Sequence, residues 1–427
     1  MRDRLRVLLS AYACSPCRGS EHAVGWQYAT NIARHHDVTV VCGDVEAEQP
    51  TKQELYAYQS RNALPEGLQV VYVGPTRWIA MFERMHRLPL MWWCYYLAYA
   101  LWQRQVLRVA KKLAASQRLD VVHHLNMIGF REPGFLYRLG IPFVLGPLGG
   151  ANNDPLAFAK GCGSGSRIAL GLRTILNEIQ KRACFRPQQA ARAAAAIFAA
   201  TPAELKMVNE IWGLPAALVP ETGATPRKSF EQREPYDSNG RLRILWSGMH
   251  CRRKCLPILT DAIACDELRA SVFVTVLGEG AETFAWRQQA ATLGLADVFD
   301  WRGKVSHAKA MQLMESNDVC AFTSIREGTP HVVLEALAAG VPVVCHDACG
   351  MGVVVDDSCG LKIPFADFQT SVLGFRDALI RLVHEPDLVR SLSRGADRRA
   401  REMSWASKAA TMSETYRRVA RDGGKKI

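Results

Sequence analysis

Short apolar runs alternate with longer segments of helical periodicity along most of the chain. Runs such as Leu5–Ala11 and Asp37–Cys42 are rich in leucine and valine, and residues 22–35 between them have a helical pattern. This alternation predicts parallel sheets covered by helices on both faces. Further strands are predicted at 68–73, 119–124, 141–146, 195–199, 242–246, 272–277, 298–299, 318–323 and 341–345, and further helices after Pro202, at 256–265 and at 404–421.

A polar stretch at 228–240, just after Pro220-Glu221-Thr222-Gly223, interrupts the alternation. It is charged and has no apolar period, which is typical of a linker. A chain of 427 residues is too long for one ordinary core, and two domains of about 200 residues each are the natural expectation. We therefore predict two doubly wound α/β domains, residues 1–223 and residues 224–403, which bind ligands at the carboxyl ends of their strands.

Composition places the chain among globular proteins, with 48% hydrophobic and 22% charged residues. Its 13 cysteines form no regular framework, and Met1-Arg2-Asp3-Arg4 runs directly into the first strand. We therefore expect no leader peptide, free thiols and a reducing cytoplasm. Cys14 and Cys17 are spaced like metal ligands, but no second pair at ligand spacing accompanies them, so we expect no metal site.

The net charge of +12 is unevenly distributed. Residues 76–112 contain seven arginines and lysines against one acid, Glu83, and many aromatic residues are interleaved with them. The central apolar run, 88–102, has about 15 residues and is shorter than the roughly 20 that span a bilayer. The segment is either a helix in the headgroup layer of a membrane or a core helix with a basic solvent face. No recognised nucleic-acid module accompanies it, so we expect no nucleic-acid partner.

The segment after the predicted strand 318–323 has the strongest functional pattern. Glu327 falls in the loop at the carboxyl end of this strand, Pro330 suits a helix start, and Gly340 suits the helix end. Glu335 would lie near the helix start, where backbone N–H groups favour a bound anion. Two carboxylates beside such a helix end suit a ligand with hydroxyl and phosphate groups. The alternative is a solvated loop acid and a helix acid favoured by the dipole.

A basic turn follows the predicted strand 242–246. It contains Gly248 and three consecutive cations, Arg252, Arg253 and Lys254. Fixed positive charge at the end of a strand suits a diphosphate and stabilises it as a leaving group. Gly278 belongs to a glycine loop that ends the next strand and is a weaker signal.

Three features of the first domain are weaker candidates. A loop with Gly19 precedes the first helix, and a second loop carries Gly149 and Gly150. Glycine lets a ligand approach the backbone closely, although a purely structural turn explains either loop. His123 ends a short strand and is followed by His124, so either ring could face a ligand.

The run Glu327–Val344 resembles the E-x7-E signature of retaining, nucleotide-sugar-dependent glycosyltransferases of family four (glycosyl transferases group 1). The resemblance implies the GT-B fold, in which two Rossmann-like domains face each other across a cleft and the last helix, here 404–421, returns to the first domain. It implies that Glu327 contacts the donor sugar and Glu335 the ribose. Met249 stands where the family has an arginine, and a single Gly19 replaces the commoner pair.

The resemblance also implies roles for the other candidates. Glu327, His123, Lys254 and Arg253 would be catalytic, and Gly149 and Gly150 would contact the acceptor. The donor would be bound by Gly19, Gly248, Arg252, Arg253, Lys254, Gly278, Glu327, Gly328, Thr329, Pro330, His331, Val332 and Glu335.

The implied reaction moves a sugar from a GDP-, UDP- or ADP-sugar to a glycan or lipid-linked acceptor, with retention and without a metal or cofactor. Cell-surface polysaccharide synthesis by a cytoplasmic enzyme, peripheral on the inner face of the membrane, fits such a reaction. Two alternatives stay open: an epimerase or phosphorylase of the same fold, and a non-catalytic basic protein that binds membrane or RNA.

Overall fold

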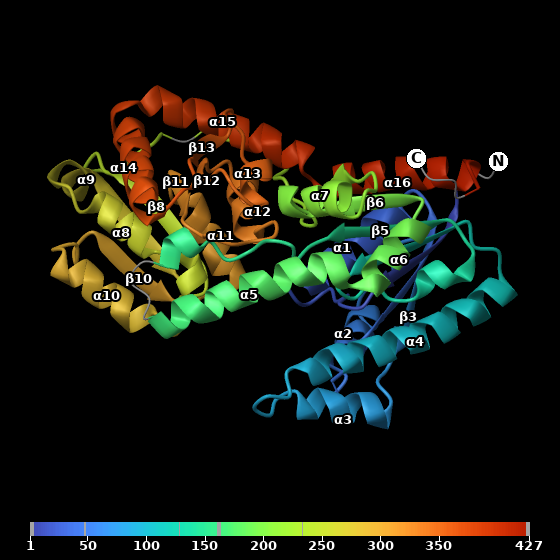
Figure 1. Cartoon of the computed structure of the whole chain (residues 1–427). Helices are drawn as coiled ribbons and strands as arrows, with labels where there is room; N and C mark the ends of the chain where they lie inside the picture. Colours follow the sequence, from blue (N-terminus) through green and yellow to red (C-terminus); the bar gives the residue numbers. More distant parts are fainter. Residues whose placement is uncertain (1–3, 47, 128, 160–163, 233, 424–427) are drawn as a thin grey trace. The chain divides into compact units, whose positions relative to one another are not determined.

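The computed structural model describes residues 4–46, 48–127, 129–159, 164–232 and 234–423 (Figure 1). The chain forms two compact units, each built around its own parallel sheet. The first unit comprises Met1–Ala151, Glu178–Glu221 and Trp405–Ile427, and the second comprises Asn152–Asn177 and Thr222–Ser404.

Seven parallel strands form the sheet of the first unit, in the order β3-β2-β1-β4-β5-β6-β7. Side chains of β1 alternate between two cores: Val7 and Leu9 pack on one face, and Leu8 packs on the other. Both faces are therefore buried, as the apolar run in the sequence requires. The strands are β1 (Arg6–Ala11), β2 (Asp37–Gly43), β3 (Leu68–Val73), β4 (Val121–Asn126), β5 (Phe143–Leu148), β6 (Ala196–Ala199) and β7 (Ala217–Leu218).

Helices connect these strands as expected for a doubly wound sheet. They are α1 (Glu21–Ala33), α2 (Pro50–Gln59), α3 (Arg77–Met85), α4 (Trp93–Ser116), α6 (Phe185–Ala193), α7 (Pro202–Lys206) and α16 (Trp405–Arg421), with the short turns η1 (Leu136–Leu139) and η3 (Met207–Ile211). Helix α5 (Ser164–Ala183) begins in the second unit and ends in the first.

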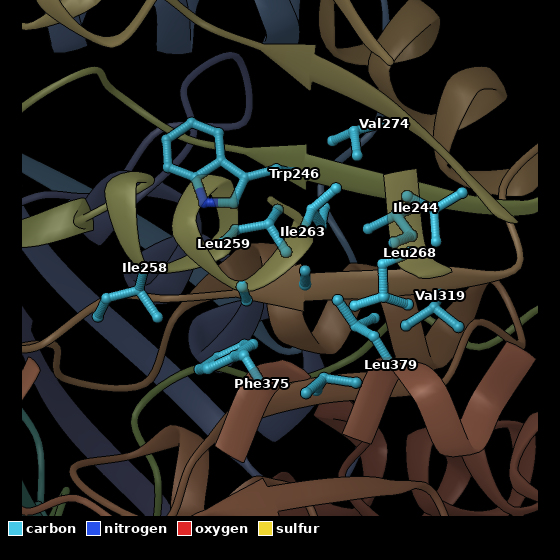
Figure 2. Close-up of a cluster of buried hydrophobic side chains, with 14 of the residues drawn as sticks. Ile244, Trp246, Ile258, Leu259, Ile263, Leu268, Val274, Val319, Phe375 and Leu379 are labelled. Carbon is cyan, nitrogen blue, oxygen red and sulfur yellow. The ribbon is translucent and has the colours of Figure 1, made fainter. Parts of the chain in front are cut away.

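The second unit repeats the arrangement with six parallel strands in the order β10-β9-β8-β11-β12-β13. Ile244 and Trp246 of β8 point into one core (Figure 2), and Leu245 between them points into the other. The strands are β8 (Leu242–Ser247), β9 (Val272–Leu277), β10 (Phe299–Gly303), β11 (Val319–Phe322), β12 (Val343–His346) and β13 (Gly360–Ile363).

Helices also cover this second sheet. Phe375 and Leu379 of α14 pack in the core drawn in Figure 2, together with Ile258, Leu259 and Ile263 of α8. The helices are η2 (Leu156–Ala159), η4 (Arg252–Lys254), α8 (Pro257–Ile263), α9 (Asp266–Ser271), α10 (Thr283–Thr292), α11 (His307–Glu315), α12 (His331–Ala338), α13 (Met351–Val354), α14 (Phe368–His384) and α15 (Pro386–Glu402).

The last helix, α16, is part of the first unit. Its buried side chains Met412, Tyr416 and Val419 join the core beneath β1 and β2. Ser413 lies on the same helix, with its hydroxyl 2.8 Å from Nε2 of His36. The chain thus returns to the first unit after completing the second.

The segment Asn152–Asn177 corrects the predicted domain boundary, because the sequence analysis placed it in the first domain. Phe158 is 7% exposed and belongs to the core of the second unit. Its ring stacks on Phe365 with centroids 4.8 Å apart, and the edge of His346 lies beside it. This burial holds the segment on the second unit, although it lies between β5 and β6 of the first sheet along the chain.

The aromatic and basic region also differs from the prediction of one helical segment. A separate helix, α3, ends at Met85, and α4 begins only at Trp93. Leu90 between them has a φ of +64°, which no helix accommodates. The segment before Trp93 is therefore a connection between two helices.

Candidate active site

The loop between β11 and α12 places Glu327 among three hydrogen-bond donors. Its Oε1 accepts a bond of 2.6 Å from the Ser324 hydroxyl and lies 2.7 Å from Nζ of Lys254. Arg253 also pairs with this oxygen. The Glu327 side chain is only 12% exposed, so water screens these charges weakly. The structure thus brings together three residues for which the sequence predicts catalytic roles.

The two cations lie on η4, at the carboxyl end of β8. Backbone contacts fix this turn against the Glu327 loop, because the Ile325 N–H donates to the Arg253 carbonyl at 2.8 Å and the Thr323 hydroxyl to the Lys254 carbonyl at 2.8 Å. Burial lowers the pKa of Lys254, and the nearby Glu327 carboxylate partly raises it again. Arg252 on the same turn is exposed, whereas Arg253 and Lys254 pair with Glu327.

Gly278 holds the glycine loop directly against the basic turn. Its φ is +108°, and a Cβ at this position would lie 1.9 Å from the Gly248 carbonyl oxygen. The Gly248 N–H donates to the Leu277 carbonyl at 3.1 Å, so the two loops pack backbone to backbone. Only glycine fits such a contact at such a φ.

The amino end of α12 directly follows Glu327. Pro330 is its N-cap residue, and His331 and Val332 open the helix. The carbonyl of Gly328 accepts from the Gly350 N–H at 3.0 Å, and that of Thr329 accepts from the Thr222 hydroxyl at 3.1 Å. These bonds fix the loop, and the helix start supplies a positive dipole end for an anion.

Glu335 lies farther into this helix than the sequence analysis expected. It is the fifth residue of α12, and its Oε1 is 2.9 Å from Nε2 of His307 on α11. Its side chain is 32% exposed and so remains accessible to a hydroxyl ligand. Sequence analysis missed His307, because nothing in the local pattern places its ring beside Glu335.

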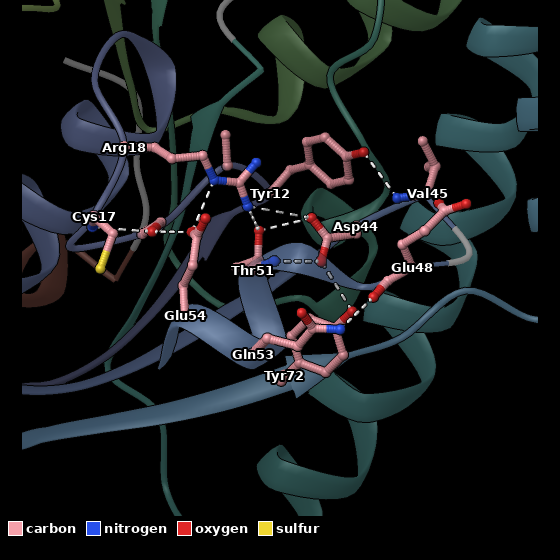
Figure 3. A network of polar contacts seen from close by, with 12 residues as sticks. Tyr12, Cys17, Arg18, Asp44, Val45, Glu48, Thr51, Gln53, Glu54 and Tyr72 are labelled. Carbon is pink, nitrogen blue, oxygen red and sulfur yellow. Dashed lines mark hydrogen bonds and ion pairs between the residues drawn. The ribbon is translucent and has the colours of Figure 1, made fainter. Parts of the chain in front are cut away.

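The Gly19 loop of the first unit is held through its neighbour Arg18. Figure 3 shows Arg18 paired with Glu54 at 2.8 Å and hydrogen-bonded to the Thr51 hydroxyl at 2.7 Å. Asp44 accepts bonds from Thr51 and from the Tyr72 hydroxyl, which fixes the start of α2. Among the described residues, no atom beyond its chain neighbours lies within 4 Å of a Cβ built at Gly19, so the loop surface there is open toward them.

The glycines after β5 turn the chain away from the first sheet. Gly150 has a φ of +84°, and the Gly149 carbonyl accepts a bond of 2.9 Å from the Phe130 N–H. The turn explains Gly150 structurally, and acceptor contact at Gly149 and Gly150 stays a prediction.

His123, for which the resemblance implies a catalytic role, is completely buried in the structure. Its Nε2 lies 2.6 Å from the Gly146 carbonyl and its Nδ1 2.6 Å from the Tyr416 hydroxyl. Burial lowers its pKa to about 4, so the ring is neutral near pH 7. With both nitrogens engaged, His123 supports the packing of β4 against α16 and has no nitrogen to offer a ligand. His124 is also buried.

Two further classes of site are not found in the part of the chain that the structure describes. No three histidine, cysteine, aspartate or glutamate residues there are grouped to hold a metal ion. None of the described helices has the length and apolar character that crossing a membrane needs.

Two parallel sheets covered by helices, one in each unit, match the GT-B class of fold. Residues 229–399 match the family Glycosyl transferases group 1, which places this match in the second unit. No curated protein matches the chain.

Solved structures with the same fold cover nearly the whole chain. Sucrose-phosphate synthase from Thermosynechococcus elongatus is 16% identical, with a TM-score of 0.65 over 97% of this chain and 99% of that one. WaaG, a glycosyltransferase involved in lipopolysaccharide biosynthesis, is 16% identical, with a TM-score of 0.57 over 96% and 99%. HepE from Anabaena, solved with UDP and glucose, is 15% identical, with a TM-score of 0.56 over 96% and 99%. At these identities the similarity establishes the fold.

Proposed function

We propose that the protein is a retaining glycosyltransferase that moves a sugar from a nucleotide diphosphate sugar to a hydroxyl group of a glycan or lipid-linked acceptor. The observation that carries this proposal is the grouping of Glu327 with Lys254 and Arg253 beside the start of α12. The match of residues 229–399 to the family Glycosyl transferases group 1 supports it. HepE was solved with UDP and glucose, which makes UDP the first nucleotide to test.

The proposed reaction depends on the charges of Glu327, Lys254 and Arg253. Lys254 and Arg253 pair with Glu327, and a diphosphate entering the site would compete for the same cations. Those cations and the helix start would stabilise the departing nucleotide diphosphate, so the proposed reaction needs no metal ion or cofactor. Glu327 would then accept hydrogen bonds from the sugar, and Glu335 from the ribose hydroxyls.

Calorimetry and thermal shift with UDP, GDP and ADP test the donor site. We expect one nucleotide to raise the melting temperature and its sugar conjugate to be consumed when an acceptor is present. Retention would be read from the anomeric configuration of the product by NMR. If no nucleotide binds, the proposal is wrong, and if the donor is altered without an acceptor, the protein is an epimerase.

A lipid-linked acceptor is supported by an exposed surface on α3 and the start of α4. Trp78 is 68% exposed, Leu90 88% and Trp92 65%. A cavity of about 640 Å³ runs along α3 and is lined by Arg77 and Arg84 together with methionine and leucine side chains. Exposed aromatic and apolar groups beside arginines fit the headgroup layer of an anionic membrane. We propose that the protein acts on the inner face of the cytoplasmic membrane, in cell-surface polysaccharide synthesis.

Vesicle flotation tests this membrane contact. The variant Arg77→Glu/Arg84→Glu should lose binding to vesicles with phosphatidylglycerol and keep its affinity for nucleotide. Arg381→Glu, which reverses the charge of an exposed arginine on α14 of the second unit, is a control at another surface and should float like the wild type. Equal flotation of all three proteins would exclude this surface as the membrane contact.

A further inference from the structure

The chain contributes a second, unpredicted group of residues to the Glu327 loop. After Gly150 the chain enters the second unit, where Asn152 and Asp154 approach this loop. The Asp154 carboxylate lies 2.6 Å from the guanidinium of Arg326, the residue just before Glu327. The side-chain amide of Asn152 donates to the Glu327 carbonyl at 3.3 Å. Two residues of one segment therefore hold two adjacent residues of the predicted catalytic loop.

These contacts are well suited to fix a backbone position. The side chains of Asp154 and Arg326 are 13% and 22% exposed, so solvent screens their pairing only weakly. The other oxygen of Asp154 lies 3.3 Å from Arg173 on α5, which orients the carboxylate from a second side. Burial lowers the pKa of Arg326, and Asp154 opposes this change and favours the charged guanidinium.

The ion pair between Asp154 and Arg326 is not needed to attach the segment Asn152–Asn177 to the second unit. Phe158, four residues beyond Asp154, already holds the segment in the core of the second unit through its stacking on Phe365. The polar contacts instead reach the one loop that carries Glu327. A partly buried ion pair contributes little net stability, but it fixes the geometry of the groups that it joins.

We propose that Asp154 is a positioning residue for sugar transfer, which sets the place of Glu327 by holding Arg326. This inference rests on the proposed function. The nucleotide diphosphate would be held by Lys254, Arg253 and the start of α12, which Asp154 does not touch. Loss of Asp154 should therefore lower kcat and leave nucleotide binding nearly unchanged. A displacement of about 1 Å in a reacting group costs roughly 100-fold in rate.

The test compares Asp154→Asn with Asp318→Asn in the full chain. Asp318 forms a similar ion pair, in which its largely buried carboxylate lies 2.6 Å from the guanidinium of Arg243. Asp318 comes just before β11, whereas Glu327 follows that strand. Asp318→Asn therefore controls for the loss of a pair that only stabilises the unit. UDP, GDP and ADP are the binding probes, and the consumption of UDP-glucose, GDP-mannose and ADP-glucose reports turnover.

We expect Asp154→Asn to bind nucleotide within about 2-fold of the wild type and to lose 10-fold to 100-fold in kcat. Asp154→Glu should recover part of this loss, and Asp318→Asn should melt earlier without a loss of kcat. A kcat of Asp154→Asn equal to that of the wild type, or a loss no greater than that of Asp318→Asn, would overturn the inference.

Hydrogen exchange separates this inference from the proposed function. Amides of residues 325–333 should exchange faster in Asp154→Asn than in the wild type, and Asp318→Asn should leave them unchanged. If these amides are equally protected in all three proteins, Asp154 does not position the loop, whatever the activity. If exchange responds but the wild type binds no nucleotide and consumes no donor, the proposed function fails, and the role in transfer fails with it.

Discussion

Glu327 pairs with two cations, Arg253 and Lys254, which would also bind the diphosphate of a ligand. Its substitution therefore tests both roles of these cations. Gln is isosteric and keeps an oxygen for the Ser324 hydroxyl, but it no longer neutralises Lys254 and Arg253. We predict that Glu327→Gln loses at least about 100-fold in sugar transfer. Its affinity for nucleoside diphosphate should equal or exceed that of the wild type, because a competing carboxylate is gone.

Steady-state turnover and calorimetry with nucleoside diphosphate measure the two effects in one preparation. Circular dichroism checks that the variant is folded. Wild-type turnover in Glu327→Gln would remove the proposed role of this residue, and weaker nucleotide binding would contradict the competition between ligand and carboxylate.

Lys254 gives the site a pH dependence with a defined sign. Burial lowers its pKa from the usual 10.5, and Glu327 opposes that change. Only the protonated amine attracts a diphosphate, so nucleotide affinity should fall as the pH rises through the lowered pKa. In Glu327→Gln the opposing carboxylate is absent, so the fall should begin at a lower pH. Calorimetry across alkaline pH measures this shift, and identical profiles for the two proteins would contradict it.

Sequence analysis could predict that Glu327 and the basic turn each follow a strand of a parallel sheet, and the structure shows that these strands, β11 and β8, are neighbours. It could not tell Arg252 from Arg253. These neighbours lie on one short 3₁₀ turn, where the backbone alone decides which side chain faces Glu327. It could not tell that His123 is buried, because a strand end in the sequence does not reveal a covering helix such as α16.

Two connecting loops at the carboxyl ends of β8 and β9 depend on one glycine. Alanine at Gly278 would adopt a φ of +108° and place its Cβ 1.9 Å from the Gly248 carbonyl. The strained conformation alone costs about 1–3 kcal/mol. We predict that Gly278→Ala lowers the free energy of unfolding by at least that amount and weakens nucleotide binding.

Urea unfolding followed by fluorescence measures this loss. Gly171→Ala is the control, because Gly171 lies within α5 and nothing is within 4 Å of its added Cβ. Alanine favours a helix over glycine by about 1 kcal/mol, so this variant should be at least as stable as the wild type. Equal stability of Gly278→Ala and the wild type would show that the two loops can move apart to accommodate the added Cβ without a loss of stability.

Strands could be predicted from the sequence where a short run of apolar residues marks them. The strands β1, β2, β8 and β9 coincide closely with apolar runs in the sequence. The segment Asn152–Asn177 was assigned to the wrong unit, because its place depends on the contact of Phe158 with Phe365, far along the chain. The same limit applies to Asp154, whose partner Arg326 is also far along the chain. Apolar periodicity predicts which residues are buried and leaves open which element buries them.

At the scale of the molecule, buried histidines set its response to acid. His36, His123, His124 and His346 are all 2% exposed or less. Burial lowers the pKa of His36, His123 and His346 to about 4 and that of His124 to about 3. In the unfolded chain each returns to about 6.5. Between these values the unfolded state binds more protons, so acid favours unfolding.

Stability should therefore be full above about pH 6.5 and should fall by several kcal/mol as the pH drops toward 4, since one pKa unit corresponds to about 1.4 kcal/mol. Urea unfolding between pH 7.5 and 4.5 measures the slope. The net charge of +12 also destabilises the folded protein in acid through repulsion between surface charges. Salt screens this repulsion but does not reduce the free-energy cost of protonating a buried imidazole. The slope should thus persist in about 0.5 M salt, where the Debye length is below 10 Å.

His346→Asn isolates one histidine of this set. The His346 ring lies 2.9 Å from the Ser371 hydroxyl and 3.1 Å from the Ser324 carbonyl, and an asparagine amide offers a donor and an acceptor without a titrating group. The variant is expected to be less stable at pH 7.5, because a smaller side chain leaves a cavity among Phe158, Phe365 and Phe375. Its stability should nevertheless fall less steeply with acid. An unchanged slope would mean that His346 titrates normally in the folded protein, and the acid sensitivity would then come from the other three buried histidines or from surface charge.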